Sequence, residues 1–158
     1  MADIAYETRD SRPLTNGLLD MDSSQAPLVS AWLALQHAPQ GSADYESLFW
    51  AFEEVCELCR SSPDEAWSFI GAAWLADQSK VVAENLSAGP LEDLLANYGE
   101  SVIDRVEAEA SANPTFAFLL GGVWRNEIKE AVWTRVVAAR DRRGWDGIPF
   151  SSGDIESN

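Results

Sequence analysis

The residues best suited to chemistry in this chain are two cysteines, one histidine and several neighbouring carboxylates. Cys56 and Cys59 are three positions apart in a segment of helical periodicity, so they point along one face but are poorly placed for a disulfide. A redox pair would instead begin a helix, where the dipole stabilises a thiolate. Most zinc sites need three or four Cys, His or carboxylate ligands, and His37 is the only histidine. We therefore expect no metal and no cofactor, and we expect both cysteines to be reduced core residues.

Catalysis would have to use the carboxylates or His37. Glu53 and Glu57 lie one helical turn apart and could act as acid and base, although such a pair on an exposed helix face is usually solvated charge. No Gly-x-Ser-x-Gly segment supplies a nucleophile. The Gly-Pro and Gly-Gly dipeptides do not form a phosphate loop, because no Lys-Ser or Lys-Thr follows them. We therefore expect a protein that is not an enzyme.

The elements that must position these residues are predicted to be helices. Apolar residues recur at spacings of three and four along most of the chain, and no segment alternates as a strand would. Residues 27–143 are therefore expected to form a single acidic all-α domain of about six to seven helices. A polar N-terminal arm, residues 1–26, precedes the domain, and a tail rich in Gly, Ser and Asp, residues 144–158, follows it.

Proline and glycine residues mark the expected helix ends. Ser62 and Glu65 form a capping-box pattern around Pro63, which predicts a helix that runs to about Asp77. This helix has almost no charge after Glu65, so we expect it to be the most buried one. Further helix starts or ends are expected at Gly89-Pro90, Gly99, Asn113-Pro114 and Asn126, the last of which would cap a helix over 127–143.

The clearest amphipathic helix spans residues 43–60, with Ser42 as its cap. The apolar positions, which are expected to face the core, are Tyr45, Leu48, Phe49, Phe52, Val55, Cys56 and Cys59. The opposite stripe is acidic and consists of Glu46, Glu53 and Glu57, with Glu54 alongside. Trp50 falls between the two faces, where it either covers the edge of the core or is exposed and anchors a partner.

A weak internal repeat supports the helical interpretation. A shift of 51 positions aligns Ser62-Pro63 with Asn113-Pro114 and superimposes the apolar residues on either side of each pair. Each copy would be an amphipathic helix, a turn and an apolar helix. Two such hairpins stacked as in HEAT repeats would explain the pattern, although any two capped hairpins could align in this way.

The chain is strongly acidic. It has 11 Lys and Arg against 26 Asp and Glu, a formal net charge of −15. Direct binding of nucleic acid or of an anionic membrane needs a basic surface and is not expected. Hydrophobic residues make up 46% of the chain and include 7 tryptophans, a composition that forms a core and is unlike that of a disordered acidic chain. Residues 124–143 hold six basic and three acidic residues, so an acidic body ends in a basic helix.

The sequence favours a cytoplasmic location. The first ten residues do not have the basic start and apolar stretch of a secretory signal. No stretch approaches the ~18 apolar residues of a membrane span.

Two segments carry a resemblance to a known family. The first is Ser87-Ala88-Gly89-Pro90-Leu91-Glu92-Asp93-Leu94-Leu95, and the second is Leu120-Gly121-Gly122-Val123-Trp124-Arg125. Together they resemble a family of small bacterial helical domains of unknown function, which pairs an A-G-P-L-E-D-L-L segment with a G-G-V-W-R segment. The resemblance covers roughly residues 45–140. It implies a bacterial source and an all-helical fold. Because the family has no assigned activity, the resemblance implies no catalytic residue.

The charged residues of these segments suit a structural role. Glu92 and Asp93 would stand at a helix start, where the dipole favours acids. Arg125 is expected to pair with one of them or with Asp104 in a buried link between the two halves of the domain. A polar pocket at this place is the alternative.

An immunity protein is the leading functional hypothesis. Such a protein would bind a secreted antibacterial toxin, for instance a basic nuclease, and would cover its active-site cleft. The residues expected to contact the toxin are Glu46, Trp50, Glu53, Glu54, Glu57, Asp104 and Glu107. The alternatives are an acidic chaperone or adaptor for a secreted effector, and a DNA mimic that inhibits a nucleic-acid-binding protein. The sequence leaves the oligomeric state open.

Overall fold

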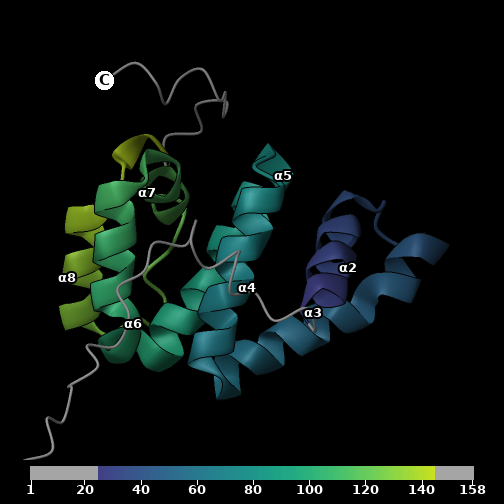
Figure 1. The fold of residues 1–158 in the computed structure, drawn as a ribbon, viewed down its shortest axis with the longest axis horizontal. Helices are drawn as coiled ribbons and strands as arrows, with labels where there is room; N and C mark the ends of the chain where they lie inside the picture. Colours follow the sequence, from purple (N-terminus) through teal and green to yellow (C-terminus); the bar gives the residue numbers. More distant parts are fainter. Residues whose placement is uncertain (1–24, 145–158) are drawn as a thin grey trace, which may run out of the picture.

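A computed structural model describes residues 25–144, and every regular element in that part of the chain is helical (Figure 1). In chain order the elements are α2 (Ala26–His37), α3 (Ala43–Ser61), α4 (Pro63–Ala76), α5 (Lys80–Leu86), the π-helical turn η1 (Ser87–Leu91), α6 (Glu92–Ala112), α7 (Pro114–Leu120), α8 (Glu130–Ala139) and the 3-10 turn η2 (Arg142–Gly144). The predicted all-α domain of six to seven helices is confirmed. Almost all of the predicted arm and tail lies outside the described residues. Within these bounds, no helix combines the length and the apolar character that a membrane crossing needs.

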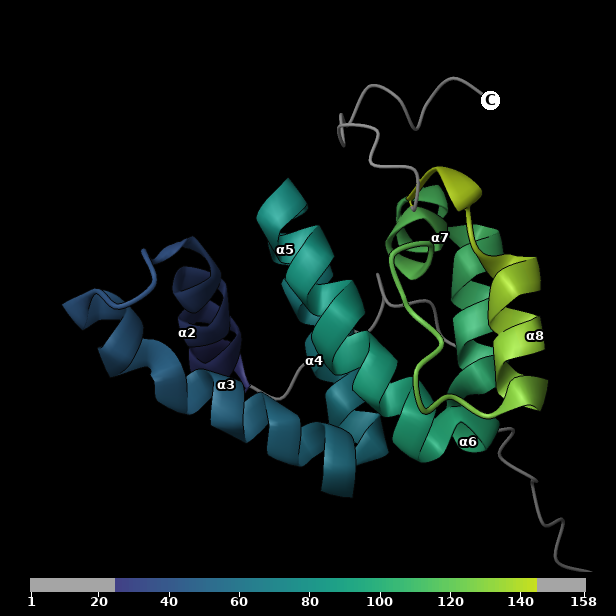
Figure 2. The ribbon, with the colours of Figure 1, turned by 180° about the vertical axis from the view of Figure 1, so that it is seen from behind.

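Helices α2 and α3 pack against each other at one end of the domain (Figures 1 and 2). As predicted, Ser42 caps α3, since its hydroxyl accepts a hydrogen bond from the Tyr45 N–H at 3.1 Å. Trp32 of α2 is almost completely buried, and its ring meets Phe69 of α4 edge-on with the ring centroids 5.6 Å apart. The α2–α3 pair is therefore joined to the rest of the core through α4.

Helix α4 is the central helix, as its lack of charge predicted. Eight of its 14 residues are buried, and it contacts α2, α3, α5 and α6. Trp67 packs edge-on against Phe116 of α7 at 5.7 Å between ring centroids. Because burial of one large apolar side chain contributes about 1.5–3 kcal/mol, this helix supplies a large share of the hydrophobic stabilisation.

Helices α5, η1 and the first part of α6 run on as one helical segment, which corrects the predicted break at Gly89-Pro90. Gly89 and Pro90 lie inside the π-helical turn rather than between two helices. The prediction of a break there was wrong because a wider turn makes room for the proline ring, and burial of Pro90 and Leu91 favours the continuous path. The change of helix predicted at Gly99 is present as a kink: Tyr98 has the non-helical angles φ −134° and ψ 23°, and α6 consists of two helical parts joined there.

Side chains of α6 complete the C-terminal end of α3. The Asn97 amide donates a hydrogen bond to the Cys59 carbonyl at 3.1 Å, and the Tyr98 hydroxyl donates one to the Arg60 carbonyl at 2.6 Å. The last carbonyls of a helix have no donors within the helix, so these bonds satisfy groups that would otherwise need water. The kinked residue of α6 is thus tied directly to α3.

Both hairpins of the predicted repeat are present, and their turns have similar φ angles but differ in ψ. Ser62, between α3 and α4, has φ −140° and ψ 75°, while Asn113, between α6 and α7, has φ −132° and ψ 101°. A proline begins the second helix in each case, although α7 has 7 residues and α4 has 14. The similar turns support the repeat, and its origin by duplication stays a prediction.

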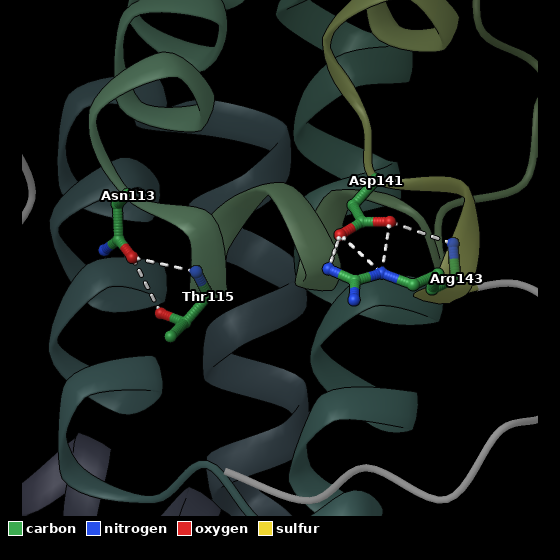
Figure 3. Close-up of polar contacts among 4 residues, drawn as sticks. All are labelled: Asn113, Thr115, Asp141 and Arg143. Carbon is green, nitrogen blue, oxygen red and sulfur yellow. Dashed lines mark hydrogen bonds and ion pairs between the residues drawn. The ribbon is translucent and has the colours of Figure 1, made fainter. Parts of the chain in front are cut away.

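The two turns differ in their caps. The Asn113 side-chain oxygen accepts hydrogen bonds from the Thr115 N–H at 3.1 Å and the Thr115 hydroxyl at 2.8 Å (Figure 3). It also accepts one from the Phe116 N–H at 3.3 Å. The Ser62 side chain makes no cap bond, so the predicted capping box with Glu65 is wrong. The backbone explains the difference, since the ψ of 75° at Ser62 departs from the extended conformation that a cap residue normally adopts.

The last helix is shorter than predicted. It begins at Glu130 and ends at Ala139, whereas the sequence suggested 127–143. Asn126 does not cap it; its φ is +35°, and its amide donates to a Glu92 carboxylate oxygen at 2.5 Å.

Beyond α8, Arg143 donates hydrogen bonds to the Asp141 carboxylate (Figure 3) and thereby lowers the pKa of Asp141 below its ordinary value.

Helix α8 lies against the kink of α6 and needs a glycine there. A Cβ atom on Gly99 would stand 2.8 Å from a methyl carbon of Val132, which is closer than real Cβ contacts come. Val132 is itself buried, and a β-branched side chain has little freedom to move aside. Gly99, which the sequence suggested as a helix end, is thus required for packing.

The cap at Asn113 leads to a stability prediction. Asn113→Ala is expected to lower the free energy of unfolding by about 1–2 kcal/mol, because the N-terminal N–H groups of α7 lose their acceptor. Ser62→Ala is the matched control: it changes the equivalent turn, where no side-chain cap bond exists, and should have almost no effect. Urea unfolding followed by circular dichroism measures both, and equal losses in the two variants would contradict the assignment.

Candidate functional site

A pocket lies between α2, α3 and the π-helical turn. Helices α2 and α5 stand on the same side of α3, as the two opposite views show (Figures 1 and 2). The pocket between them has a volume of about 340 Å³. It is lined by Trp32 and Gln36 of α2, by Phe52, Val55, Cys56 and Cys59 of α3, and by Asn85, Ala88, Gly89, Pro90 and Asp93 of the α5–η1–α6 segment.

The π-helical turn brings the first family-like segment to this pocket. Pro90 has no N–H, and in an α-helix its ring would collide with the carbonyl four residues earlier. The wider turn avoids that collision, and the Pro90 carbonyl accepts a hydrogen bond from the Cys59 thiol at 3.5 Å. Gly89 suits the position before a proline, where a Cβ disfavours helical backbone. A Cβ there would meet no atom within 4 Å, so space is not the reason for the glycine.

The polar groups of the pocket are two amides, two thiols and one carboxyl group. Gln36 uses its amide N–H to donate to the Trp32 carbonyl at 3.0 Å, and Asn85 uses its own to donate to the Val81 carbonyl at 2.9 Å. The amide oxygens, at the other end of each group, are acceptors. The Asp93 carboxyl adds a third acceptor group. None of the pocket-lining residues is Lys, Arg or His.

The pocket environment raises the pKa of three acidic groups. Burial raises the pKa of Asp93, and the neighbouring Glu92 carboxylate adds to this effect, while Arg60 opposes it. Burial and the charge of Asp93 raise the pKa of the Cys56 thiol. The same two causes, followed by Cys56, raise the pKa of Cys59 to about 12. Both cysteines are free thiols, and at neutral pH they stay protonated and are weak nucleophiles.

The outer face of α3 carries five of the predicted contact residues. Glu46, Glu53, Glu54 and Glu57 are all exposed, and Trp50 is 48% exposed. Two aromatic residues assigned to the core prove to be exposed as well: Phe49 at 37% and Phe52 at 46%. The two rings stack with their centroids 5.3 Å apart. We call the exposed side chains of Phe49, Trp50 and Phe52 the α3 aromatic patch; Phe49 and Phe52 form its stacked pair, and Trp50 lies on the other side of the row formed by Glu46, Glu53 and Glu57.

The prediction for Phe49 and Phe52 was wrong because the packed side of α3 is narrow. The buried residues of α3 are Ala51, Val55 and Cys59, which form one row at four-residue intervals. The short elements α2 and η1 contact α3 and leave the adjacent aromatic row uncovered. The sequence pattern showed a wide apolar stripe, but only the partner helices decide how much of it is covered.

The predicted contact residues on α6 are in a different environment. Arg135 of α8 donates hydrogen bonds to Asp104, at 2.6 Å, and to Glu107. Lys129 pairs with Glu100 at 3.2 Å. Arg135 of α8 and Lys129 just before it therefore neutralise the acidic stripe of α6. On α3, Glu57 pairs with Arg60 of the same helix at 3.0 Å, whereas Glu46, Glu53 and Glu54 are exposed acids. Asp104 and Glu107 do not lie on the same helix as the α3 aromatic patch, and their role in binding stays a prediction.

The two family-like segments meet in the structure. A Cβ on Gly122 would lie 2.5 Å from the Ser87 hydroxyl oxygen and 3.1 Å from its Cβ, so this glycine allows the second segment to approach the first. Gly121 and Val123 are buried beside it. Asn126 then bonds Glu92, as described above. The predicted buried link through Arg125 is wrong, because Arg125 is exposed, as is Trp124 at 55%.

A pocket does lie beside the first segment, but neither Glu92 nor Arg125 lines it. Gly89, Pro90 and Asp93 of the first segment line this pocket, which has polar groups. Among residues 25–144, no three His, Cys, Asp or Glu side chains come close enough together to hold a metal ion.

Comparison with known proteins identifies the family. The family of unknown function DUF6869 matches residues 38–144. The chain belongs to this family. The match confirms the resemblance to a domain family of unknown function and includes both segments. No curated protein and no solved structure matches the chain. Because the DUF6869 match begins after α2, the pocket wall formed by Trp32 and Gln36 lies outside it.

The contact between the segments yields a second prediction. Gly122→Ala is expected to cost about 1–3 kcal/mol of stability, as overpacking of a close contact does. Adding Ser87→Ala removes the hydroxyl that the new methyl meets and should recover part of the loss. Thermal unfolding of the two single variants and the double variant measures this coupling, and simple additivity would contradict the contact.

The buried carboxyl yields a third prediction. Since the folded-state pKa of Asp93 is raised, its ionised form destabilises the fold above that pKa, and the penalty vanishes below the unfolded-state pKa. Asp93→Asn should therefore raise the stability at pH 7, with the difference shrinking as the pH falls toward 3.8, the ordinary aspartate value. Unfolding curves at several pH values measure this, and a variant less stable at pH 7 would show that Asp93 is structural.

Proposed function

We propose that this member of DUF6869 is a bacterial immunity protein that binds a secreted antibacterial toxin in the cytoplasm of the producing cell. The protein would be a binding partner and not an enzyme. It would act by covering the active-site cleft of the toxin, and a basic nuclease is the toxin class that fits best. One observation carries the proposal: exposed aromatic rings and exposed carboxylates lie side by side along α3.

The α3 aromatic patch has the composition of a binding surface. Phe49, Trp50 and Phe52 are each more than a third exposed, and Phe49 and Phe52 stack on each other. Large exposed apolar groups that adjoin one another mark interaction surfaces on folded domains. Aromatic side chains of this kind commonly dominate the binding energy at the centre of an interface. Glu46, Glu53, Glu54 and Glu57 would form its polar rim.

The charge supports a basic partner. The net charge of −15 produces an attractive field for a cationic protein, and complementary charge speeds association. A nucleic-acid-binding cleft is cationic because it must hold phosphates. Carboxylates on α3 would therefore attract such a cleft, and the aromatic patch would hold the complex once it forms.

Two features distinguish this proposal from its alternatives. A DNA mimic needs rows of open acids, and the acids of α6 that would extend such a row are paired with Arg135 and Lys129. The DNA backbone that such a mimic imitates consists of sugars and phosphates, so the exposed aromatic rings of α3 would have no role in the imitation. A chaperone or adaptor for a secreted effector would use the patch as well, but its cargo would be an apolar segment rather than a basic protein.

Affinity capture of the tagged full chain from its own host lysate tests the proposal. Mass spectrometry identifies the proteins retained at low and at high salt. One stoichiometric basic protein with nuclease activity, inhibited on binding, is the expected result. A largely apolar effector would favour the adaptor, and a nucleic-acid-binding protein of the host itself would favour the DNA mimic.

Charge reversal on α3 gives the fourth prediction. In the Glu53→Lys, Glu57→Lys double variant, association with the captured basic partner should slow by roughly tenfold or more at low salt, and this difference should shrink at high salt. The melting temperature should hardly change, because both side chains are exposed.

Glu127 and Glu130 provide the matched control. They are exposed acids near the start of α8, and their reversal changes the net charge by the same amount. Surface plasmon resonance measures the association rates of both double variants. Equal slowing in the two would show a general field effect and no specific role for α3, while unfolding of the first variant would make its glutamates structural.

A further inference from the structure

The pocket beside η1 has the size of a small-molecule site. Its volume of about 340 Å³ falls in the range of roughly 300–1,000 Å³ that is typical of ligand sites. It is separate in chemistry from the outer acids of α3, although Phe52 belongs both to its wall and to the α3 aromatic patch. The inference below does not depend on the proposed function.

One side of the pocket is aromatic and apolar. The Phe52 ring is partly exposed, whereas Trp32, which also lines the pocket, is held in place by its buried contact with Phe69. Val55 and Pro90 add further apolar surface. The negative face of an aromatic ring attracts a cation and also packs well against a flat apolar group.

The polar side of the pocket has a carboxyl group and no cationic side chain. Asp93 contributes a half-buried carboxyl group, and none of the lining residues is Lys, Arg or His. Arg60, the cation that acts on Asp93, does not line the pocket. Gln36 and Asn85 each use one of their two amide N–H bonds on a carbonyl of their own helix, and the Cys59 thiol donates to the Pro90 carbonyl. The pocket therefore combines one carboxylate with neutral amide and thiol groups, a set that favours a cation over an anion.

We propose that this pocket is a binding site for an organic cation, namely an amidinium, guanidinium or primary ammonium group carried on an apolar body. The cationic group would donate hydrogen bonds to Asp93 and to the amide oxygens of Gln36 and Asn85, while the apolar body would lie against Phe52. A bound cation would also compensate the charge of a carboxylate that burial otherwise penalises. Asp93 thus has a reason to be present in a pocket where it lowers stability.

The cation can come from a free small molecule or from a basic side chain of another protein. Both sources would present a cationic nitrogen group to Asp93, and they differ in the part of the molecule that carries this group. Benzamidine is a flat aromatic amidinium and represents the first source. N-acetyl-arginine-N-methylamide places a guanidinium on a peptide backbone and represents the second. Benzamide has the shape of benzamidine without its charge.

Isothermal titration calorimetry on the full chain at neutral pH tests the site. Benzamidine or the arginine derivative should bind at least about tenfold more tightly than benzamide, in line with a hydrogen bond to a charged group. Tighter binding of benzamidine would indicate a free small molecule, and tighter binding of the arginine derivative would indicate a protein side chain. Equal binding of benzamide and the cations would overturn the proposal, as would no binding of either cation up to about 10 mM.

Two variants and two matched controls assign the binding to the pocket. Asp93→Asn should weaken cation binding about tenfold and abolish the preference over benzamide, while its melting temperature stays at or above that of the parent protein. Phe52→Ala, which removes an exposed ring, should weaken binding several-fold. Glu54→Gln and Trp50→Ala remove a similar charge and a similar exposed ring from α3 outside the pocket and should have no effect. Unchanged binding in Asp93→Asn would place the cation elsewhere and overturn the assignment.

Discussion

Pro90 in the middle of a continuous helical segment is the constraint on which the rest of the described structure depends. The residue cannot donate a backbone hydrogen bond, and its ring needs more room than an α-helical turn provides. The chain meets this constraint with a π-helical turn at Ser87–Leu91 rather than with a break. As a result α5 and the first part of α6 remain one segment that can contact α2, α3, α4 and α7 along its length. The same turn supplies the carbonyl that the Cys59 thiol binds and the residues that line the pocket.

The meeting of the two family segments follows from that turn. Ser87 begins the π-helical turn, and Gly122 approaches it so closely that no larger residue fits without a shift. Gly89, Pro90 and Asp93 lie on the pocket side of this region, and Glu92 bonds Asn126. The segments by which the family was recognised therefore combine a packing contact with a pocket. Gly89 and Pro90 in the first segment fit the backbone geometry of the π-helical turn, whereas burial raises the pKa of Asp93, whose carboxyl group lines the pocket.

Charge is organised by contacts between helices as much as by composition. The basic residues of α8 lie against acids of α6, so that part of the surface is a network of exposed ion pairs. Such pairs contribute little to stability at an exposed surface, but they remove open carboxylates from it. On α3, Glu57 pairs with Arg60, and Glu46, Glu53 and Glu54 are exposed on the helix that also carries Phe49, Trp50 and Phe52. This helix therefore combines exposed acids with three exposed aromatic rings.

The sequence by itself determined the helical class, most helix starts and the identity of the central helix, because capping residues, prolines and apolar periodicity act over a few neighbouring positions. It also singled out the segment that lines the pocket. Only the tertiary structure decided that Pro90 lies within a continuous helix, that Phe49 and Phe52 are exposed, and that Arg135 rather than Arg125 pairs with Asp104. Each of these depends on residues far apart in the chain. A local pattern shows which side chains are apolar or charged, but which of them are covered or paired is decided by the helices that pack beside them.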